Sequence, residues 1–200
     1  MIKCVIFDIG RVLLTYEPQE YLESRFSSEK AGDLLELIYL SDCWRKLDQG
    51  LMDFSQAKEA FSGLRPDLSL DVEKLISKES FLELIKPIPE SIELLKDLKA
   101  KGFRICLLSN FSSEGFGWVQ EAYDFWKLAD EMIISSKVKL AKPDPAIFSL
   151  LLSSLGLEPS ECLFIDDTLE NVEAAEKLGI NGFVFKKASQ CAEFCSSILY

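Results

Sequence analysis

Five short, mostly apolar runs constrain the fold of this chain more than any other feature. They are rich in β-branched and aromatic residues, and they lie at Ile2–Phe7, Phe103–Leu108, Glu131–Ile134, Cys162–Ile165 and Gly182–Phe185. Continuous apolar runs of this length are typical of strands buried on both faces, as in a parallel sheet covered by helices. Because helical patterns separate the runs, the sequence predicts an α/β fold with a doubly wound, Rossmann-like parallel sheet.

Signals for helix ends support this alternation. Gly102 and Gly156 stand where two helical patterns end, as glycine commonly does after a last helical turn. Asp144 and Thr168 are expected to cap helix N-termini, because a short polar side chain can accept a hydrogen bond from a free backbone N–H there. The helical patterns themselves occupy 89–102, 142–156 and 167–179.

The stretch from about Pro18 to Lys86 breaks the alternation. It follows the first strand directly and contains no good strand, so we expect a helical insertion over the carboxyl end of that strand. Its amphipathic helical patterns lie at 18–26, 29–40, 53–61 and 71–85. The predicted division is a core of residues 1–16 and 87–200 and a helical insertion of residues 17–86.

Charge and composition restrict the partners and the compartment. A formal net charge of −11 with no basic run argues against nucleic acid and anionic membranes and favours a small-molecule partner. No apolar stretch approaches the roughly 18 residues that span a bilayer, and the first three residues offer no signal peptide. The six cysteines show no CxxC spacing, and the spacing of Cys191 and Cys195 fits chance better than a metal pair. We therefore expect a reducing, cytoplasmic location.

The chain contains no histidine. This excludes Ser-His-Asp and Cys-His catalysis, imidazole bases and histidine-ligated zinc sites. Acid–base and metal chemistry must then use carboxylates, which favour a hard cation such as Mg²⁺.

Polar residues follow the predicted strands at their carboxyl ends, where ligands bind in open α/β sheets. Each of them alone has an ordinary structural explanation, such as a turn, a helix cap or a solvated surface. In this order and on successive elements, they predict a site at one edge of the sheet. They are Asp8 after the first strand, Ser109 and Asn110 after the second, Lys142 before the helix that follows the third, and Asp166 and Asp167 after the fourth.

Through these motifs the chain resembles the haloacid dehalogenase-like (HAD) hydrolase superfamily over essentially its whole length. The motifs are, in order, FDIGRVLL, LLSNF, KLAKPDPAIF and FIDDTLENVEAAEKLG. Together with WRKLDQGLMDFSQAKEAF at 44–61, they are similar to the branch that includes sugar-phosphate phosphatases of the glucose-1-phosphatase type. The resemblance implies that the insertion, residues 17–86, is the helical cap of this family.

The resemblance also implies a role for each residue at the strand ends. Asp8 matches the nucleophile and Ser109 a phosphate-binding hydroxyl, with Asn110 beside it on the substrate side. Lys142 matches a lysine that neutralises the nucleophile and the phosphoryl oxygens. The implied Mg²⁺ ligands are Asp8, the backbone carbonyl of Gly10, Asp166 and, through water, Asp167, with Asn171 orienting the acid pair.

The activity implied by the resemblance is that of a Mg²⁺-dependent phosphatase. It would hydrolyse a small phosphorylated metabolite, such as a sugar phosphate, through an aspartyl-phosphate intermediate. Candidate contributors from the cap are Trp44, Arg45 and Asp48, each of them a candidate for contact with the substrate, and Arg11 is a candidate that reaches into the cleft. Tyr16 and Glu17 lie where the chain is expected to hinge into the cap.

Gly10 departs from the pattern. Most phosphatases of the superfamily carry a second aspartate here, which protonates the leaving oxygen and then activates water. Losing a positioned acid–base group forfeits about 10²–10⁴ in rate. Three possibilities stay open: a cap residue or a metal-held water substitutes, the leaving group is an easy one such as an anomeric phosphate, or the protein is slow or inactive. The similar branch also carries glycine here and includes working phosphatases, which favours activity.

Three rival functions remain. A non-catalytic binding or regulatory module would account for Gly10. A 2-haloacid dehalogenase, which uses the same aspartate without a metal, is disfavoured because such enzymes lack the acid pair Asp166-Asp167. Phosphoryl transfer to an acceptor other than water would use the same residues as hydrolysis.

Overall fold

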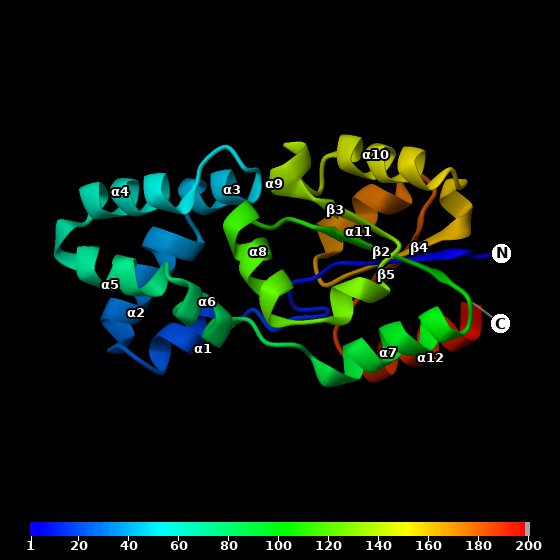
Figure 1. Cartoon of the computed structure of the whole chain (residues 1–200), viewed down its shortest axis with the longest axis horizontal. Coiled ribbons are helices and arrows are strands. Elements are labelled where there is room, and N and C mark those ends of the chain that lie inside the picture. Colours follow the sequence, from blue (N-terminus) through cyan, green and yellow to red (C-terminus); the bar gives the residue numbers. More distant parts are fainter. Residues whose placement is uncertain (199–200) are drawn as a thin grey trace.

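The computed structural model describes residues 1–198, in which five strands form one sheet with the order β3-β2-β1-β4-β5 (Figure 1). All neighbouring strands are parallel. The predicted doubly wound α/β sheet is therefore confirmed, with β1 at its centre. The strands are β1 (Cys4–Phe7), β2 (Arg104–Ser109), β3 (Glu131–Ile134), β4 (Cys162–Asp166) and β5 (Asn181–Val184).

Some strand ends differ slightly from the prediction. β1 begins at Cys4 rather than Ile2. β2 extends through Ser109, because this residue still pairs with Ile134 of β3. β5 begins one residue earlier than predicted, since Asn181 pairs with Leu163 of β4.

Helices cover both faces of the sheet, because alternate strand residues point to opposite sides. Val5 and Phe7 share an apolar cluster with α7 (Pro89–Ala100) and α12 (Ala188–Ile198). Cys4 and Ile6 share another with α10 (Pro145–Leu155) and α11 (Leu169–Glu176). Figure 1 shows the two helix pairs on opposite sides of the strands. No helix in the part of the chain that the structure describes is long and apolar enough to cross a membrane. The helices that follow the cap are α7 (Pro89–Ala100), α8 (Ser113–Ala122), η3 (Phe125–Leu128), α9 (Ser135–Val138), α10 (Pro145–Leu155), η4 (Pro159–Glu161), α11 (Leu169–Glu176) and α12 (Ala188–Ile198).

Most of the predicted helix ends are confirmed. Asp144 accepts a hydrogen bond of 2.8 Å from the Ala146 backbone N–H at the start of α10. Gly102 and Gly156 adopt left-handed φ angles of 90° and 62° after α7 and α10. Thr168 occupies the N-cap position of α11, as predicted, but its side chain makes no capping hydrogen bond. Its backbone N–H instead donates to Asp166 Oδ1 at 2.8 Å, since that carboxylate already lies at the helix start.

The cysteines lie mainly in the apolar interior. Cys4, Cys106 and Cys162 come from three neighbouring strands, with the sulfur atoms of the first two 3.3 Å apart. Cys191 and Cys195 are buried in the cluster between α12 and the sheet. These positions suit thiols that act as small hydrophobic groups.

The segment between β1 and α7 is helical, as predicted. The predicted helix 71–85 is two helices, because the chain turns after Ile76 and Ser77 caps the second helix by accepting from the Ser80 N–H at 3.2 Å. The pattern 29–40 is an α-helix followed by a π-helical turn. The helix α3 (Asp42–Asp48) is too short to give a clear amphipathic pattern. The elements are α1 (Pro18–Glu23), α2 (Ser28–Leu34), η1 (Leu35–Tyr39), α3 (Asp42–Asp48), α4 (Phe54–Leu64), η2 (Pro66–Leu68), α5 (Ser69–Leu75) and α6 (Lys78–Leu84).

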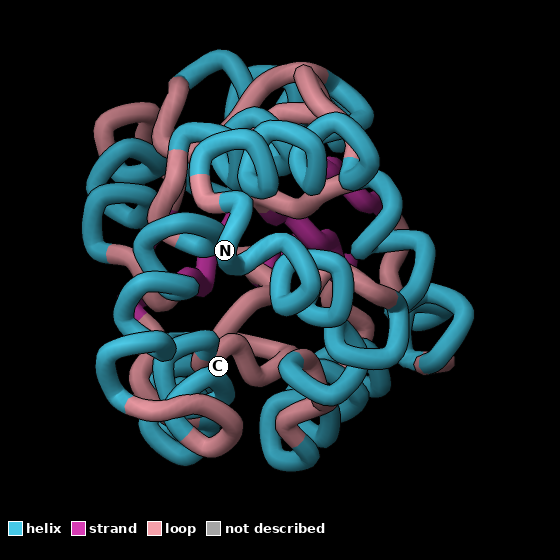
Figure 2. Tube along the Cα trace, turned by 90° about the vertical axis from the view of Figure 1, so that its left-hand side faces the viewer, coloured by secondary structure: helices cyan, strands magenta, loops and turns pink. Residues whose placement is uncertain are grey.

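These helices gather beyond the carboxyl end of β1. Figure 2, which views the molecule from their side, shows helices in front of the strands. We propose to treat residues 17–86 as the cap and residues 1–16 with 87–200 as the core.

Polar contacts fasten the cap to the core. The Ser135 hydroxyl donates to the backbone oxygen of Asp48, and Lys139 Nζ donates to the backbone oxygen of Gly50. At the start of α4, the Phe54 N–H donates to the Glu114 carboxylate at 2.7 Å. One apolar cluster also continues from the sheet into the cap. The end of α3 and the start of α4 are thereby held against α8 and α9.

Replacing Gly50 tests this docking. The residue has φ of 63°, and a Cβ there would overlap the backbone oxygen of Ser136. Gly50→Ala should therefore lower the free energy of unfolding by about 1–3 kcal/mol, measured by urea denaturation. Gly63→Ala in α4 is the matched control, because a Cβ at Gly63 meets no atom within 4 Å and should stabilise the helix slightly. Equal stability of the two variants would contradict the docking contact.

Candidate active site

The three central strands bring the predicted residues to one edge of the sheet. Phe7 pairs with Ile165 in the register of β1 and β4, so Asp8 and Asp166 are the next residues along the two strands. The Asp8 N–H continues this pairing with a 2.8 Å hydrogen bond to the Ile165 oxygen. Ser109 ends β2 on the other side of β1 and is buried. The strand order alone therefore places a hydroxyl and two carboxylates together.

Lys142 joins the two carboxylates. Its Nζ lies 2.7 Å from Asp8 Oδ1 and 2.6 Å from Asp166 Oδ2, and its side chain is 1% exposed. Burial alone would lower the pKa of Lys142, but Asp8 and Asp166 outweigh it and raise the pKa above its ordinary value. The lysine therefore stays charged in the interior.

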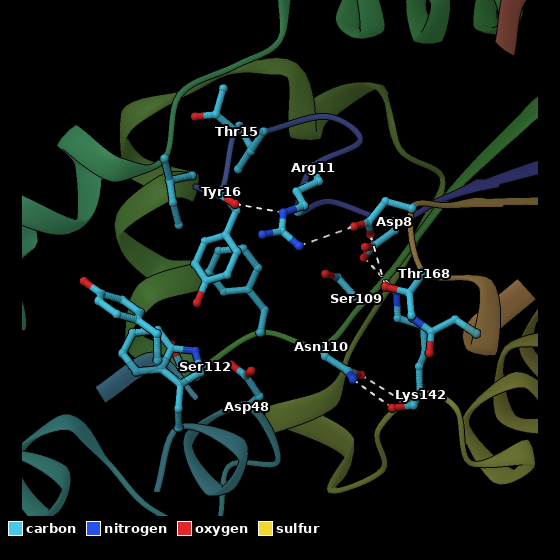
Figure 3. Close-up of a pocket in the computed structure, with 18 of the residues that line it drawn as sticks. Asp8, Arg11, Thr15, Tyr16, Asp48, Ser109, Asn110, Ser112, Lys142 and Thr168 are labelled. Carbon is cyan, nitrogen blue, oxygen red and sulfur yellow. Dashed lines mark hydrogen bonds and ion pairs between the residues drawn. The ribbon is translucent and has the colours of Figure 1, made fainter. Parts of the chain in front are cut away.

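Asn110 holds the backbone of Lys142. Its Oδ1 accepts from the Lys142 N–H at 2.8 Å, and its Nδ2 donates to the Lys142 carbonyl oxygen at 2.9 Å (Figure 3). We predict from the sequence that Asn110 binds substrate. It does line the cavity, but both ends of its amide are already engaged by the lysine backbone. Its contacts are those of a residue that positions Lys142.

Asp166 is fixed by further donors. Asn171 Nδ2 donates to both of its carboxylate oxygens at 3.1 Å, and the Thr168 N–H donates to Oδ1. Asp166 is fully buried, so these donors replace water around its charge. The predicted orienting contact from Asn171 is thus present for Asp166.

The carboxylates of Asp8, Asp166 and Asp167 form a group suited to a divalent cation. One oxygen from each lies within 4.8 Å of the other two. Three carboxylates face two positive charges, Lys142 between Asp8 and Asp166 and Arg11 at 3.8 Å from Asp167. Asp8 Oδ1 is buried without a hydrogen bond of regular geometry. Oxygen ligands with an excess of negative charge are what Mg²⁺ prefers. The residues present therefore fit this metal, with Gly10 beside them in the cavity wall.

The pKa values of these acids reflect the same charge excess. Burial raises the pKa of Asp8 to about 6; Asp166 adds to the rise, while Lys142 and the Ser109 hydroxyl oppose it. Burial and the neighbouring Asp166 also raise the pKa of Asp167, against the opposing effect of Arg11. A cation between these groups would relieve the repulsion that holds their pKa values up.

A cavity of about 310 Å³ opens above this edge, between the core and the cap. Figure 3 shows Asp8 on one side and Tyr16 with Asp48 on the other. Its cap side is lined by rings, among them Tyr39 and Trp44, whose centroids are 4.8 Å apart. The site thus combines a charged end at the sheet with an aromatic wall at the cap.

The other predicted substrate contacts, Arg11, Trp44 and Arg45, all line the cavity. Trp44 is 8% exposed and packs in the aromatic wall, whereas Arg45 is mostly exposed and pairs with Asp42. Arg11 has φ of 56° and donates to the Tyr16 carbonyl oxygen at 2.9 Å. Its guanidinium also pairs with Glu17 at 3.1 Å and lies 3.8 Å from Asp167.

Several cavity residues are absent from the sequence prediction. Tyr39 and Phe81 line the space with no motif beside them in the sequence, and Phe111 and Ser112 line it at the end of the LLSNF motif without a predicted role. Their patterns indicate only helices and loops, because the contacts that bring them together join segments far apart in the chain. Asp48, named from the sequence with Trp44 and Arg45 as a candidate contributor from the cap, is the acidic residue that the cap adds to the lining.

Comparison with known proteins agrees with this geometry. A sesquiterpene phosphatase of Aspergillus oryzae is 25% identical over 181 residues, which cover 90% of this chain and 88% of the relative. A phosphorylated carbohydrates phosphatase of Thermotoga maritima is 28% identical over 186 residues, covering 89% and 82% of the two chains.

A solved structure has the same fold. It is a HAD family enzyme of Bacteroides thetaiotaomicron in complex with magnesium and inorganic phosphate, with a TM-score of 0.75 and 23% identity. The match covers 93% of this chain and 95% of the other. The family model described as haloacid dehalogenase-like hydrolase matches residues 2–179. The chain therefore belongs to the haloacid dehalogenase-like hydrolases, the family that its sequence motifs resemble.

Proposed function

We propose that the protein is a Mg²⁺-dependent phosphatase that hydrolyses a small phosphorylated metabolite through an aspartyl-phosphate intermediate. The observation that carries this proposal is the buried arrangement of Asp8, Lys142 and Asp166 beside Asp167 at the base of a cavity. A nucleophilic carboxylate, a fixed cation beside it and an acid pair are groups suited to phosphoryl transfer from an ester to an aspartate.

Asp8 is the proposed nucleophile. One of its oxygens would bond to phosphorus as the bond from phosphorus to the leaving oxygen breaks. A carboxylate and a phosphate ester repel each other, so positive charge must lie beside both. Lys142 supplies one such charge at 2.7 Å from Asp8. Mg²⁺, held by Asp8, Asp166, Asp167 and the Gly10 backbone carbonyl, would supply charge neutralisation for the same step.

Ser109 is the proposed phosphate-binding hydroxyl. It lies at the end of β2 and contributes a hydrogen bond that lowers the pKa of Asp8, which supports its place beside the reacting group. Asn110 would act on the substrate through Lys142, whose backbone it holds. Water would then attack phosphorus and release Asp8, which makes hydrolysis the complete reaction.

The cavity supports a small leaving group with ring or hydrocarbon surface. Its charged end would take the phosphoryl group, and Trp44, Tyr39 and the other rings would cover the remainder. The names of the relatives include a phosphatase of phosphorylated carbohydrates and one of sesquiterpenes, and a sugar ring or an apolar chain would each suit such a wall. We propose a sugar phosphate as the first class to test.

Replacing the nucleophile is the direct test. Asp8→Asn keeps the shape of the side chain but removes the attacking charge, so turnover of p-nitrophenyl phosphate with Mg²⁺ should fall at least about a thousandfold. Circular dichroism should show an unchanged fold. Asp124→Asn, an exposed acid whose side chain is 87% accessible, is the control and should keep full activity. Residual turnover of more than a few per cent in Asp8→Asn would rule out this nucleophile.

Removing one proposed ligand tests the metal site. Asp166→Asn should raise the Mg²⁺ concentration for half-maximal activity by more than about tenfold, because an amide oxygen binds a hard cation less strongly. Glu170→Gln, an exposed neighbour on α11, should leave that concentration unchanged. Exhaustive chelation should abolish turnover in the unchanged protein. Phosphatase turnover that survives chelation would contradict the proposed metal requirement, whereas turnover of a 2-haloacid that survives it would favour metal-free dehalogenation.

A further inference from the structure

The site lacks an acid–base group where Gly10 stands. Gly10 has no side chain to offer, and a Cβ built there would meet no atom within 4 Å, so packing does not explain the glycine. Hydrolysis of an alkyl phosphate still needs a proton for the leaving oxygen. The other side of the cavity is therefore the place to look for a donor.

Asp48 is the carboxylic acid that the cap contributes to this cavity. It is the last residue of α3 and lines the same space as Asp8. Figure 3 shows it on the side opposite Asp8, between Ser112 and Asn110. The remaining charged side chains of the lining are Asp8, Arg11, Arg45, Lys142 and Asp167.

The backbone around Asp48 is fixed to the core. The Ser135 hydroxyl donates to the Asp48 backbone oxygen and accepts from the Phe111 N–H at 2.9 Å, which ties the end of α3 to the loop that follows β2. Lys139 adds a contact to the Gly50 oxygen. The Ser112 backbone N–H lies close enough to the Asp48 carboxylate to favour its charged form. Asp48 is thereby held at a defined position over the ends of the strands.

The charge environment of Asp48 suits proton transfer. Within residues 1–198, no lysine or arginine pairs with it, in contrast to Asp8 and Asp166. Burial raises the pKa of Asp48 to about 7, with the charge of Asp8 adding to the rise and the Ser112 N–H opposing it. A group that is half protonated near neutral pH can donate a proton in one step and accept one in the next.

We propose that Asp48 is the acid–base residue of this enzyme, supplying from the cap the function that Gly10 cannot provide; this rests on the proposed phosphatase activity. In the first step, the Asp48 carboxylic acid donates its proton to the leaving oxygen. The P–O bond to the leaving group breaks as a bond forms between phosphorus and an Asp8 oxygen, and the alcohol departs.

The second step restores both acids. The Asp48 carboxylate accepts a proton from water as the water oxygen bonds to phosphorus. The bond between phosphorus and Asp8 breaks, inorganic phosphate leaves, and Asp48 is again a carboxylic acid. No oxidant or additional reactant is needed.

Two esters of similar size separate the proton donor from other roles. p-Nitrophenyl phosphate has a leaving group that needs no proton, whereas benzyl phosphate releases a basic alkoxide unless it is protonated. In Asp48→Asn, kcat/KM for benzyl phosphate should fall about 10²–10⁴-fold, and kcat/KM for p-nitrophenyl phosphate should change by less than about tenfold. A burst of about one p-nitrophenol per enzyme should appear as well, because water attack then limits turnover.

Asp42→Asn is the matched control, since Asp42 lies on the same helix with a side chain that is 77% exposed. It should leave both esters unaffected. An equal loss for both esters in Asp48→Asn, as from an undocked cap, or no loss for either, would overturn the proposal. If the unchanged protein hydrolyses neither ester, or if Asp8→Asn remains active, the phosphatase function itself fails. An inactive Asp8→Asn with a non-selective Asp48→Asn counts against Asp48 alone.

Discussion

The ion pairs of Lys142 with Asp8 and Asp166 are the interaction on which the site depends. Removing one partner from a buried ion pair costs about 3–5 kcal/mol, so the lysine requires both carboxylates within reach. Neighbouring positions of β1 and β4 supply them, and Asn110 fixes the lysine backbone from the end of β2. With Arg11 3.8 Å from Asp167, two positive charges still face three carboxylates. The remaining negative charge suits a divalent cation. A phosphate ester is itself an anion, so it suits this site only together with that cation.

Core and cap contribute different chemistry to one cavity. The core provides the groups proposed to act on phosphorus. They lie at the ends of β1, β2 and β4 and, for Lys142, in the loop before α10. The cap provides the aromatic wall and Asp48, which reach the strands only because α3 docks on Ser135 and Lys139. Selection of the leaving group and transfer of its proton would then both depend on the docking of the cap against the core, whereas binding of the phosphoryl group would not.

The sequence predicts the sheet well because residues buried on both faces leave a continuous apolar run that does not depend on distant contacts. It also predicts which acids meet, since the carboxyl ends of parallel strands share one edge. The sequence does not predict contacts between residues far apart in the chain, or helices too short to show a pattern. Thr168 stands at the N-cap position, but its side chain makes no capping hydrogen bond, and its N–H donates to Asp166. The place of Asp48 opposite Asp8 follows from docking of α3, a seven-residue helix without a clear pattern of its own.

A crystal structure of the protein with Mn²⁺ in place of Mg²⁺ and inorganic phosphate would test the central claim most directly, because the anomalous signal of manganese locates the ion without ambiguity. Our account predicts one strong peak coordinated jointly by side-chain oxygens of residues 8 and 166, with the phosphate between that ion and the Ser109 hydroxyl. A peak elsewhere, or an ion bound without either carboxylate while phosphate fills the cavity, would contradict it.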